Sequence, residues 1–259
     1  MLIDCFSFFN ELDLLALRLR VLDPVVTHFI AVQGEETHAG NPKPMYLDPA
    51  DARWRTWAGR LSSVTVPRMP PDTDRWTREQ QMRHVKAAAL APYATDDVVI
   101  LSCADEIPDP RLFPALLPAL SLDQWVGFLT ACYYYYLDLR CPKAFHCIQL
   151  ARVDTVRHYG AEALSVRRKT PPIGPIPGGW HFSYLGGVEA IRTKLGAFAH
   201  AEYDTPTYTN PDRLAHRIAN HQDPITRDRL LPAPLSELPD EVQQYPDRYA
   251  AFLRPGRTP

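Results

Sequence analysis

Two adjacent carboxylates, Asp105 and Glu106, follow the apolar run VVILS at 98–102 and precede Pro108. If that run is a buried strand, the pair lies just past its carboxyl end, where open α/β sheets bind their ligands. Neighbouring carboxylates repel each other unless a cation or hydrogen-bond donors compensate them. Mg²⁺ or Mn²⁺ bound to a diphosphate would do so, because these ions take oxygen ligands from carboxylates and phosphates. The alternative is that the two acids only cap the next turn.

A second group of polar residues lies in the segment GGWHFSYLGGVEAIRTKL at 178–195. A Gly-Gly turn precedes an expected helix whose first turn contains Glu189, and because the helix dipole stabilises an acid there, a purely structural role is open. As a catalyst, an exposed Glu189 would accept a proton from an attacking hydroxyl group. Trp180 and Tyr184 would stack on a sugar face, unless Trp180 belongs to the core.

The first hundred residues must position these groups, and strand-like and helix-like segments alternate there. We expect strands at 2–9, 28–32, 64–66 and 98–102. Asn10 is the expected N-cap of the first helix, and Thr77 and Gln80 open the second helix with capping-box spacing. Short strand and helix units in this order predict an α/β single domain with a mostly parallel central sheet flanked by helices.

The second half of the sequence is less regular. The segment 125–140 reads as a strand in which Tyr133–Tyr136 alternate between two faces, and at least two of these tyrosines should pack in the core. The Pro- and Gly-rich segment 167–179 is expected to be a surface loop, and such loops often act as lids. We place the main domain at 1–230, followed by a proline-rich segment, 231–259, that packs on it or is partly disordered.

The composition excludes several classes of protein. A formal charge of −2 without blocks of like charge gives no reason to expect nucleic acid or an anionic membrane as a partner. The N-terminus has no basic signal-peptide region, and no apolar run approaches the roughly 20 residues that a membrane span needs. The five cysteines lack a CxxC pair, which argues against a disulfide framework and a zinc cluster. These features predict a cytoplasmic protein.

Five ordered blocks of the sequence resemble glycosyltransferase family 17, and together they extend from about residue 3 to residue 253. The blocks are 4–32, 37–44, 96–108, 178–200 and, more weakly, 245–253. The resemblance implies a GT-A type fold with a Rossmann-like nucleotide-binding half. It also implies an inverting transferase that moves a sugar, most plausibly N-acetylglucosamine, from a UDP-sugar to a glycan or other hydroxyl acceptor, with Mn²⁺ or Mg²⁺ as cofactor.

The resemblance and the chemistry of the side chains together assign roles to individual residues. Glu189 is the expected base, with Glu202 or Asp204 as substitutes. The expected metal ligands are Asp105, His181 and His200, although each histidine is as well explained by a structural role. The expected donor-binding residues are Phe8, Asn10, Glu11, Arg83, Asp105, Glu106, Trp180 and Lys194. Asn10 could instead be only a helix cap, and Arg83 or Lys194 only a surface charge.

Two positions depart from the family pattern. Cys103 stands where the acidic motif has its first Asp, which in the family makes a water-mediated metal or ribose contact, and its loss leaves donor choice and metal dependence open. Asp105 retains the position of the direct metal contact, and Gln33 stands where relatives tend to have Glu. These departures keep open a catalytically silent protein that binds a sugar nucleotide or glycan. A nucleotidyltransferase is less favoured, because the loop after the first strand lacks the glycine-rich basic sequence that would hold phosphates.

Overall fold

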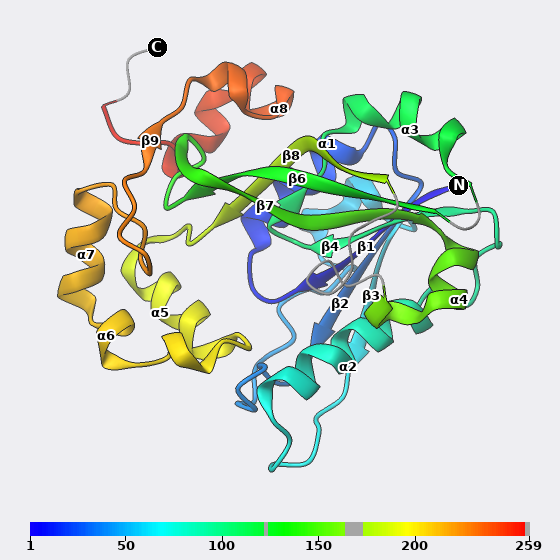
Figure 1. The fold of residues 1–259 in the computed structure, drawn as a ribbon, viewed down its shortest axis with the longest axis horizontal. Coiled ribbons are helices and arrows are strands. Elements are labelled where there is room, and N and C mark those ends of the chain that lie inside the picture. The colour runs from blue at the N-terminus through cyan, green and yellow to red at the C-terminus, as the bar shows by residue number, and fades with distance from the viewer. Residues whose placement is uncertain (122–123, 164–172, 257–259) are drawn as a thin grey trace.

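A mixed nine-stranded sheet forms the centre of the molecule (Figure 1). The computed structural model describes residues 1–121, 124–163 and 173–256. Eight strands follow one another in the order β3-β2-β1-β4-β7-β6-β8-β5, and the short β9 pairs with β7. Helices cover both faces of the sheet, so the chain forms one mixed α/β domain whose sheet is curled.

The N-terminal half of the sheet is parallel, as the sequence predicted. Its strands are β1 (Leu2–Phe8), β2 (His28–Gly34), β3 (Leu61–Val66) and β4 (Val98–Cys103). The helical elements between them are α1 (Leu12–Leu22), η1 (Ala52–Trp57) and α2 (Arg75–Ala88). β1 pairs in parallel with β2 and β4, and β2 pairs in parallel with β3.

The other half of the sheet is largely antiparallel, so the expectation of a mostly parallel sheet holds only for the first half. Its strands are β5 (Glu106–Ile107), β6 (Trp125–Tyr134), β7 (Leu139–Arg152), β8 (Ile173–Ser183) and β9 (Leu231–Pro232). β7 pairs antiparallel with both β4 and β6, whereas β6 and β8 are parallel. Only four residues connect β6 to β7, and a connection that short can join only antiparallel strands.

Two helical layers bury the two faces of the parallel strands. The remaining helical elements are η2 (Pro110–Leu112), α3 (Phe113–Ala119), α4 (Val153–Ala163), α5 (Gly187–Ala197), η3 (Ala201–Tyr203), α6 (Pro206–Thr209), α7 (Pro211–Ala219), η4 (Leu235–Glu237), α8 (Asp240–Gln244) and η5 (Pro246–Phe252). In Figure 1, α2 and α4 lie below the sheet, and α1, α3 and α8 lie above it. Within β1, Ile3 and Cys5 belong to the core shared with α2 and α4, and Phe6 belongs to the core shared with α1. A strand covered on both faces is mainly apolar on both, and the charged exception in β1 is Asp4, which is paired with a buried arginine.

The C-terminal part packs against two different surfaces. Leu238, Val242 and Tyr249 are buried in the same core as α1. Residues of α5 and α7 instead form a third core with the ends of β6 and β7, which includes Ile191 and Leu214. The proline-rich segment therefore contributes to the main core as far as Leu253.

Two helix starts differ from the sequence prediction. Asn10 is not the N-cap of α1; that position is Glu11, whose side chain accepts hydrogen bonds from the preceding amides of Phe9 (3.3 Å) and Asn10 (3.1 Å). α2 begins after Asp74, whose carboxylate accepts from the amides of Trp76 (2.9 Å) and Thr77 (3.0 Å). The predicted capping box at Thr77 is therefore wrong, because an acid three residues earlier already satisfies the free amides of the first turn.

The expectation of an irregular loop at 167–179 is wrong for its second part. Residues 173–179 belong to β8, and residues 164–172 lie outside the described part of the chain. The pairing of β8 with β6 is interrupted at two register shifts, which suits a strand whose prolines cannot donate hydrogen bonds. At Gly179, where φ is 99°, a Cβ atom would lie 2.5 Å from the carbonyl oxygen of Ile107. Glycine there lets β8 approach β5 closely.

The tyrosine run packs in the core, as predicted. Tyr133, Tyr134 and Tyr135 are 1%, 7% and 4% exposed. The alternation of a strand ends at Tyr134, because Tyr135 has φ of 68° and turns its hydroxyl group to the carbonyl of Gln222 (2.7 Å). The tyrosines are therefore buried by the turn that follows β6 as well as by the strand itself.

A fully buried ion pair joins α1 to the middle of the sheet. Arg18 makes a two-pronged contact with Asp4 of β1, with Nε–Oδ2 at 2.7 Å and Nη2–Oδ1 at 2.6 Å. The same guanidinium donates to Ser102 Oγ (2.6 Å) and to the carbonyls of Cys103 (2.9 Å) and Glu106 (2.6 Å). Arg18 therefore holds both ends of the turn that contains Asp105.

Replacing Arg18 by methionine should lower the free energy of unfolding by about 3–5 kcal/mol, because it leaves a buried carboxylate without its partner. Urea denaturation followed by circular dichroism measures this loss. The double variant Asp4→Leu/Arg18→Met should lose less than Arg18→Met alone, since it removes the unpaired charge. Equal losses in the two variants would contradict the ion-pair explanation.

The Asp74 cap makes a pH-dependent contribution to stability. The hydrogen bond from the Thr77 hydroxyl, followed by that from the Thr77 amide, lowers the pKa of Asp74. A lowered pKa in the folded state stabilises the fold above the unfolded value, which is near 3.9, and this stabilisation is lost as the pH falls through the folded value.

We therefore expect Asp74→Ala to be less stable than the native chain at pH 7, with the difference shrinking below about pH 4. Asp74→Asn is the matched control, because asparagine caps helices without a titrating group. Thermal unfolding at pH 7 and pH 3 measures both differences. A difference between Asp74→Ala and the native chain that does not change with pH would contradict this account.

Candidate active site

The turn from β4 to β5 places Asp105 at the carboxyl end of the parallel strands. The amide of Ala104 donates to the carbonyl of Ser7 on β1 (2.9 Å), and the amide of Phe182 on β8 donates to the carbonyl of Asp105 (2.8 Å). The backbone at Asp105 therefore connects the parallel half of the sheet to β8. Arg18 donates hydrogen bonds to the carbonyl groups at both ends of the turn, so several elements fix the position of the Asp105 carboxylate.

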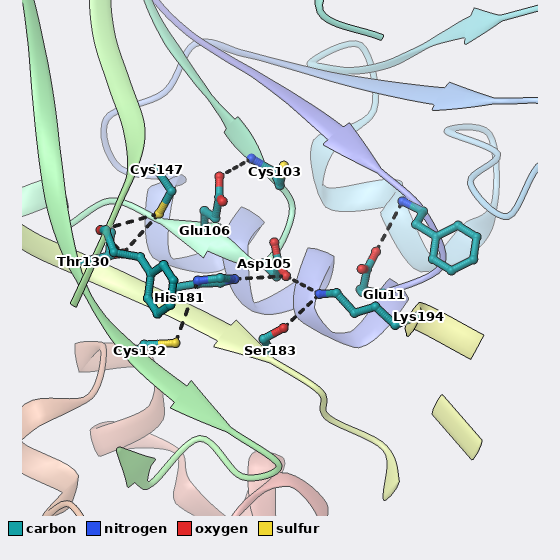
Figure 2. Close-up of polar contacts among 12 residues, drawn as sticks. Glu11, Cys103, Asp105, Glu106, Thr130, Cys132, Cys147, His181, Ser183 and Lys194 are labelled. Carbon is teal, nitrogen blue, oxygen red and sulfur yellow. Dashed lines mark hydrogen bonds and ion pairs between the residues drawn. The ribbon is translucent and has the colours of Figure 1, made fainter. Parts of the chain in front are cut away.

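The Asp105 carboxylate binds two cationic partners from the C-terminal half of the chain. Lys194 Nζ of α5 lies 2.5 Å from Asp105 Oδ2 and 3.0 Å from Ser183 Oγ, and His181 Nε2 of β8 lies 3.4 Å from the same carboxylate oxygen (Figure 2). The side chain of Asp105 is 8% exposed, whereas those of His181 and Lys194 are 17% and 25% exposed. The positive partners thus lie nearer to solvent than the acid does.

These contacts fix the charge states. Burial alone would raise the pKa of Asp105, but Lys194 and His181 hold it well below its usual range. Burial would lower the pKa of Lys194, yet the Asp105 carboxylate, with a smaller contribution from Glu11, raises it. The pKa of His181 is also raised, because Asp105 outweighs the effect of burial. Lys194 is therefore a permanent ammonium group beside a permanent carboxylate.

Glu106 points toward the neighbouring backbone. Its Oε2 accepts a hydrogen bond from the amide of Cys103 (2.7 Å), and burial raises its pKa, with Asp105 adding to the effect. Burial also raises the pKa of the Cys103 thiol far above its ordinary value. The substitution of cysteine for the first acid of the family motif therefore removes a negative charge from this turn.

Gln33, the second departure from the family pattern, has a structural role in this chain. Its side-chain amide donates to the carbonyl of Leu47 (2.7 Å) and to Ser63 Oγ (2.8 Å), and its carbonyl oxygen accepts from the amide of Leu47 (3.3 Å). A neutral amide can donate and accept at once, which a carboxylate cannot. Gln33 thereby fixes the segment that follows β2.

The group around Asp105, as arranged, does not fit a hard divalent cation. Asp105 Oδ2 already binds Lys194 and His181, so an ion that used this oxygen would have to displace the ammonium group. Cys103 and Glu106 have ligand atoms within 4.8 Å of those of Asp105. A buried thiol is a poor ligand for Mg²⁺ or Mn²⁺, which favour oxygen.

The other expected metal ligand, His200, has different partners. It follows α5, where its Nδ1 lies 2.6 Å from Glu202 Oε1 and its ring contacts the ring of Trp76 edge-on at 4.8 Å. Of the expected metal ligands, the structure therefore brings together Asp105 and His181 and records other contacts for His200.

The residues expected to bind the sugar donor divide into two groups. Glu11 lies beside Lys194 (Figure 2), so these two join Asp105 at the edge of the sheet. Phe8 and Trp180 are core side chains, 2% and 4% exposed, and the indole N–H of Trp180 donates to the carbonyl of Glu237 (2.7 Å). Neither therefore presents a face to a ligand, contrary to the expectation.

Arg83 is bound within its own helix. Its Nη2 lies 2.6 Å from Glu79 Oε1, one turn earlier on α2, so this predicted diphosphate contact is already paired with an acid. Asn10 contributes its backbone amide to Glu11. The described contacts connect neither residue to Asp105.

The three carboxylates considered as the base all lie on α5 or just after it. Glu189, 77% exposed, contacts Arg192 Nη1 at 3.0 Å. It precedes Lys194 by five residues, which is about 7.5 Å along a helix axis. Glu202 contacts His200, and Asp204 contacts Arg75 Nη2 at 2.8 Å. Glu189 is thus open to solvent, and none of the described contacts joins it to the Asp105 group.

Sequence reasoning missed an aromatic and cationic group beside Glu11. The rings of Phe9 and Tyr46 meet edge-on at 6.1 Å, and Lys43 Nζ lies 5.7 Å and 5.2 Å from their centres. Burial lowers the pKa of Lys43, and Glu11 opposes that effect. The block 37–44 contains Lys43 and is part of the family resemblance, but its sequence alone did not indicate that Lys43 lies beside Glu11.

Two small hollows in the described structure lie away from Asp105. One is lined by Leu14, Leu17 and Tyr249, between α1 and the C-terminal segment. The other is lined by His38, Arg78 and residues at the ends of β2 and β3. Neither hollow has Asp105, His181 or Lys194 in its lining.

None of the described helices is both long and apolar enough to cross a membrane.

No curated protein matches the sequence. The solved structures similar to this one include TarS 1-349 from S. aureus, with 7% sequence identity and a TM-score of 0.40, covering 85% of this chain and 71% of that chain. They also include the inositol-1-phosphate CTP transferase from T. maritima, with 8% identity and a TM-score of 0.35, covering 70% of this chain and 86% of that chain.

The family comparison is more informative than these distant structures. The model of glycosyltransferase family 17 matches residues 1–251, nearly the whole chain, and so includes the Asp105 turn, β8 and α5. The resemblance carried by the five sequence blocks is thereby confirmed. The chain belongs to glycosyltransferase family 17 and is a glycosyltransferase.

Proposed function

We propose that this glycosyltransferase transfers N-acetylglucosamine from a UDP-sugar to a glycan or other hydroxyl acceptor, with inversion, in an active site of the GT-A type. The observation that carries the proposal is the Lys194–Asp105 pair at the carboxyl ends of β1 and β4. A fixed ammonium group at that edge suits a ligand with a diphosphate. Membership of the family supports the reaction class, and the ammonium group at the carboxyl ends of these strands indicates where the diphosphate would bind.

Lys194 is the residue that we assign to the diphosphate. Asp105 and Ser183 hold its Nζ, and its raised pKa keeps it charged at any physiological pH. A charged donor forms strong hydrogen bonds to phosphate oxygens. Because the ammonium group is positioned before the reaction, it would stabilise the negative charge that develops on the departing UDP.

The nucleotide would lie toward Glu11. A carboxylate at the end of the first strand can accept hydrogen bonds from ribose hydroxyl groups, as acidic residues do in other nucleotide sites. The rings of Phe9 and Tyr46 offer surfaces on which a base can stack. Lys43 adds a second positive charge on the same side.

The transfer would be a single displacement. The acceptor oxygen forms a bond to the anomeric carbon while the bond from that carbon to the phosphate oxygen breaks, and UDP leaves with the electron pair. Glu189 accepts the proton of the acceptor hydroxyl group. A divalent cation, which the family resemblance implies, would neutralise diphosphate charge; in this chain we assign that role to the ammonium group of Lys194.

Screening UDP-sugars for hydrolysis, transfer and thermal stabilisation, with and without Mn²⁺, tests the donor and the cofactor together. We expect UDP-N-acetylglucosamine to stabilise the protein and to release UDP when an acceptor is present. Binding of the donor without release of UDP for any acceptor would instead favour a catalytically silent sugar-nucleotide binding protein, the alternative that Cys103 and Gln33 raise.

Lys194→Met should lower kcat/KM for the donor roughly 100- to 1000-fold, by analogy with the loss of a preorganised transition-state donor. Lys143→Met is the matched control, because Lys143 also pairs with an acid, Asp228 (2.6 Å), but is 55% exposed and has no assigned role in the site. Steady-state kinetics with the best donor measure both variants. Equal effects of the two substitutions would contradict the role of Lys194.

Glu189→Gln should lower kcat roughly 100- to 10,000-fold, the usual contribution of a general base. Its affinity for UDP, measured by calorimetry, should not change, because Glu189 lies away from the Asp105 group. Glu202→Gln and Asp204→Asn are the comparison variants. Full activity of Glu189→Gln, with a loss in either comparison variant, would move the base to the turn after α5.

A further inference from the structure

We propose that Glu106, Cys147 and His181 form a binding site for Zn²⁺ or a similar transition metal ion. One ligand atom from each residue lies within 4.8 Å of the other two (Figure 2). The site is next to the Asp105 group but differs from it in chemistry, and the inference goes beyond the transferase activity. It also differs from the sequence expectation, which found no zinc cluster because the three residues are far apart in the chain.

The pairing of β5 with β8 accounts for two of the ligands. Glu106 and His181 are direct partners in this antiparallel pair, so their side chains extend to the same face. The turn held by Arg18 fixes one residue, and the neighbouring strand fixes the other. Both positions therefore belong to the sheet and not to a loop.

A β-bulge accounts for the third ligand. In the pairing of β6 with β7, Phe128 opposes Ile148 and Leu129 opposes His146, so Cys147 is the additional residue between them. A bulge redirects the side chain at its position. Here the thiol lies 3.1 Å from Thr130 Oγ1 and close to Glu106 and His181. Without the extra residue, the side chains that follow along β7 would exchange faces.

The ligand types select the metal. A thiolate, an imidazole and a carboxylate are ligands of Zn²⁺, whereas Mg²⁺ and Mn²⁺ favour oxygen. Three protein ligands leave one tetrahedral position for water or another ligand. Cys132 Sγ lies 3.9 Å from His181 Nδ1, so a second sulfur atom is nearby. Cys147 would bind as a thiolate, with its proton passing to solvent.

All three ligands are partly exposed, so an ion can reach them from solution. His181 also contacts Asp105, and a bound ion would compete for this imidazole. We therefore expect Zn²⁺ to inhibit sugar transfer. This consequence for activity rests on the proposed function, whereas the binding of the ion does not.

The test is direct titration of metal-free, tag-free protein with Zn²⁺ by calorimetry and with Co²⁺ by absorption spectroscopy, under reducing conditions and without substrate. We expect one ion per chain and a thiolate-to-cobalt charge-transfer band. Cys147→Ala should abolish the band and weaken Zn²⁺ binding by more than the roughly 10- to 100-fold that the loss of an outer-shell partner costs. Cys5→Ala, which removes a fully buried thiol of β1, is the matched control and should retain both signals.

Circular dichroism and thermal unfolding establish that each variant is folded. Glu106→Gln is the second test, because it keeps the thiol and should weaken Zn²⁺ binding while a weakened thiolate band remains. Absence of stoichiometric binding by the native chain, or equal binding by Cys147→Ala, would overturn the proposal. These measurements use no sugar donor, so a failure of the proposed transferase activity would leave their outcome unchanged.

Discussion

A buried carboxylate at Asp105 requires a cation, and meeting that requirement connects the two halves of the molecule. Asp105 follows the last strand of the parallel half of the sheet, whereas Lys194 and His181 come from the second half of the chain. An unpaired charge at 8% exposure would be costly, so β8 and α5 must dock where they do. The buried charge of Asp105 also positions the ammonium group of Lys194, to which the proposed function assigns the diphosphate.

Arg18 has the matching role on the other side of the same turn. Its guanidinium neutralises Asp4 and donates hydrogen bonds to the carbonyls of Cys103 and Glu106. Because this donor group is rigid and planar, it restrains the turn. The result is a turn whose backbone is held by Arg18 and whose Asp105 carboxylate binds Lys194 and His181 at the edge of the sheet. The site is therefore built on strands and on a buried helix, which supports preorganised catalysis.

The two departures from the family pattern are consistent with this arrangement. Cys103 stands in place of an acid in this turn. The carboxylate of Asp105 is therefore compensated by cations of the protein, Lys194 and His181. Gln33 replaces an acid by an amide that ties down Leu47 and Ser63. Fewer acids at this edge reduce the need for an additional hard cation, and the softer donor set of Glu106, Cys147 and His181 lies on the neighbouring strands.

The sequence by itself determined most of the local elements of the first hundred residues, the parallel first half, the core tyrosines and the family, because strand and helix periodicity and ordered motifs are local signals. It identified Asp105, Lys194, Glu11 and His181 without showing that they meet. Tertiary structure decided that Lys194 pairs with Asp105 across 89 positions, that Trp180 and Phe8 are buried, and that a bulge directs Cys147 toward His181. Contacts between residues far apart in the chain depend on strand register and helix docking, and neither is encoded in the spacing of any single segment.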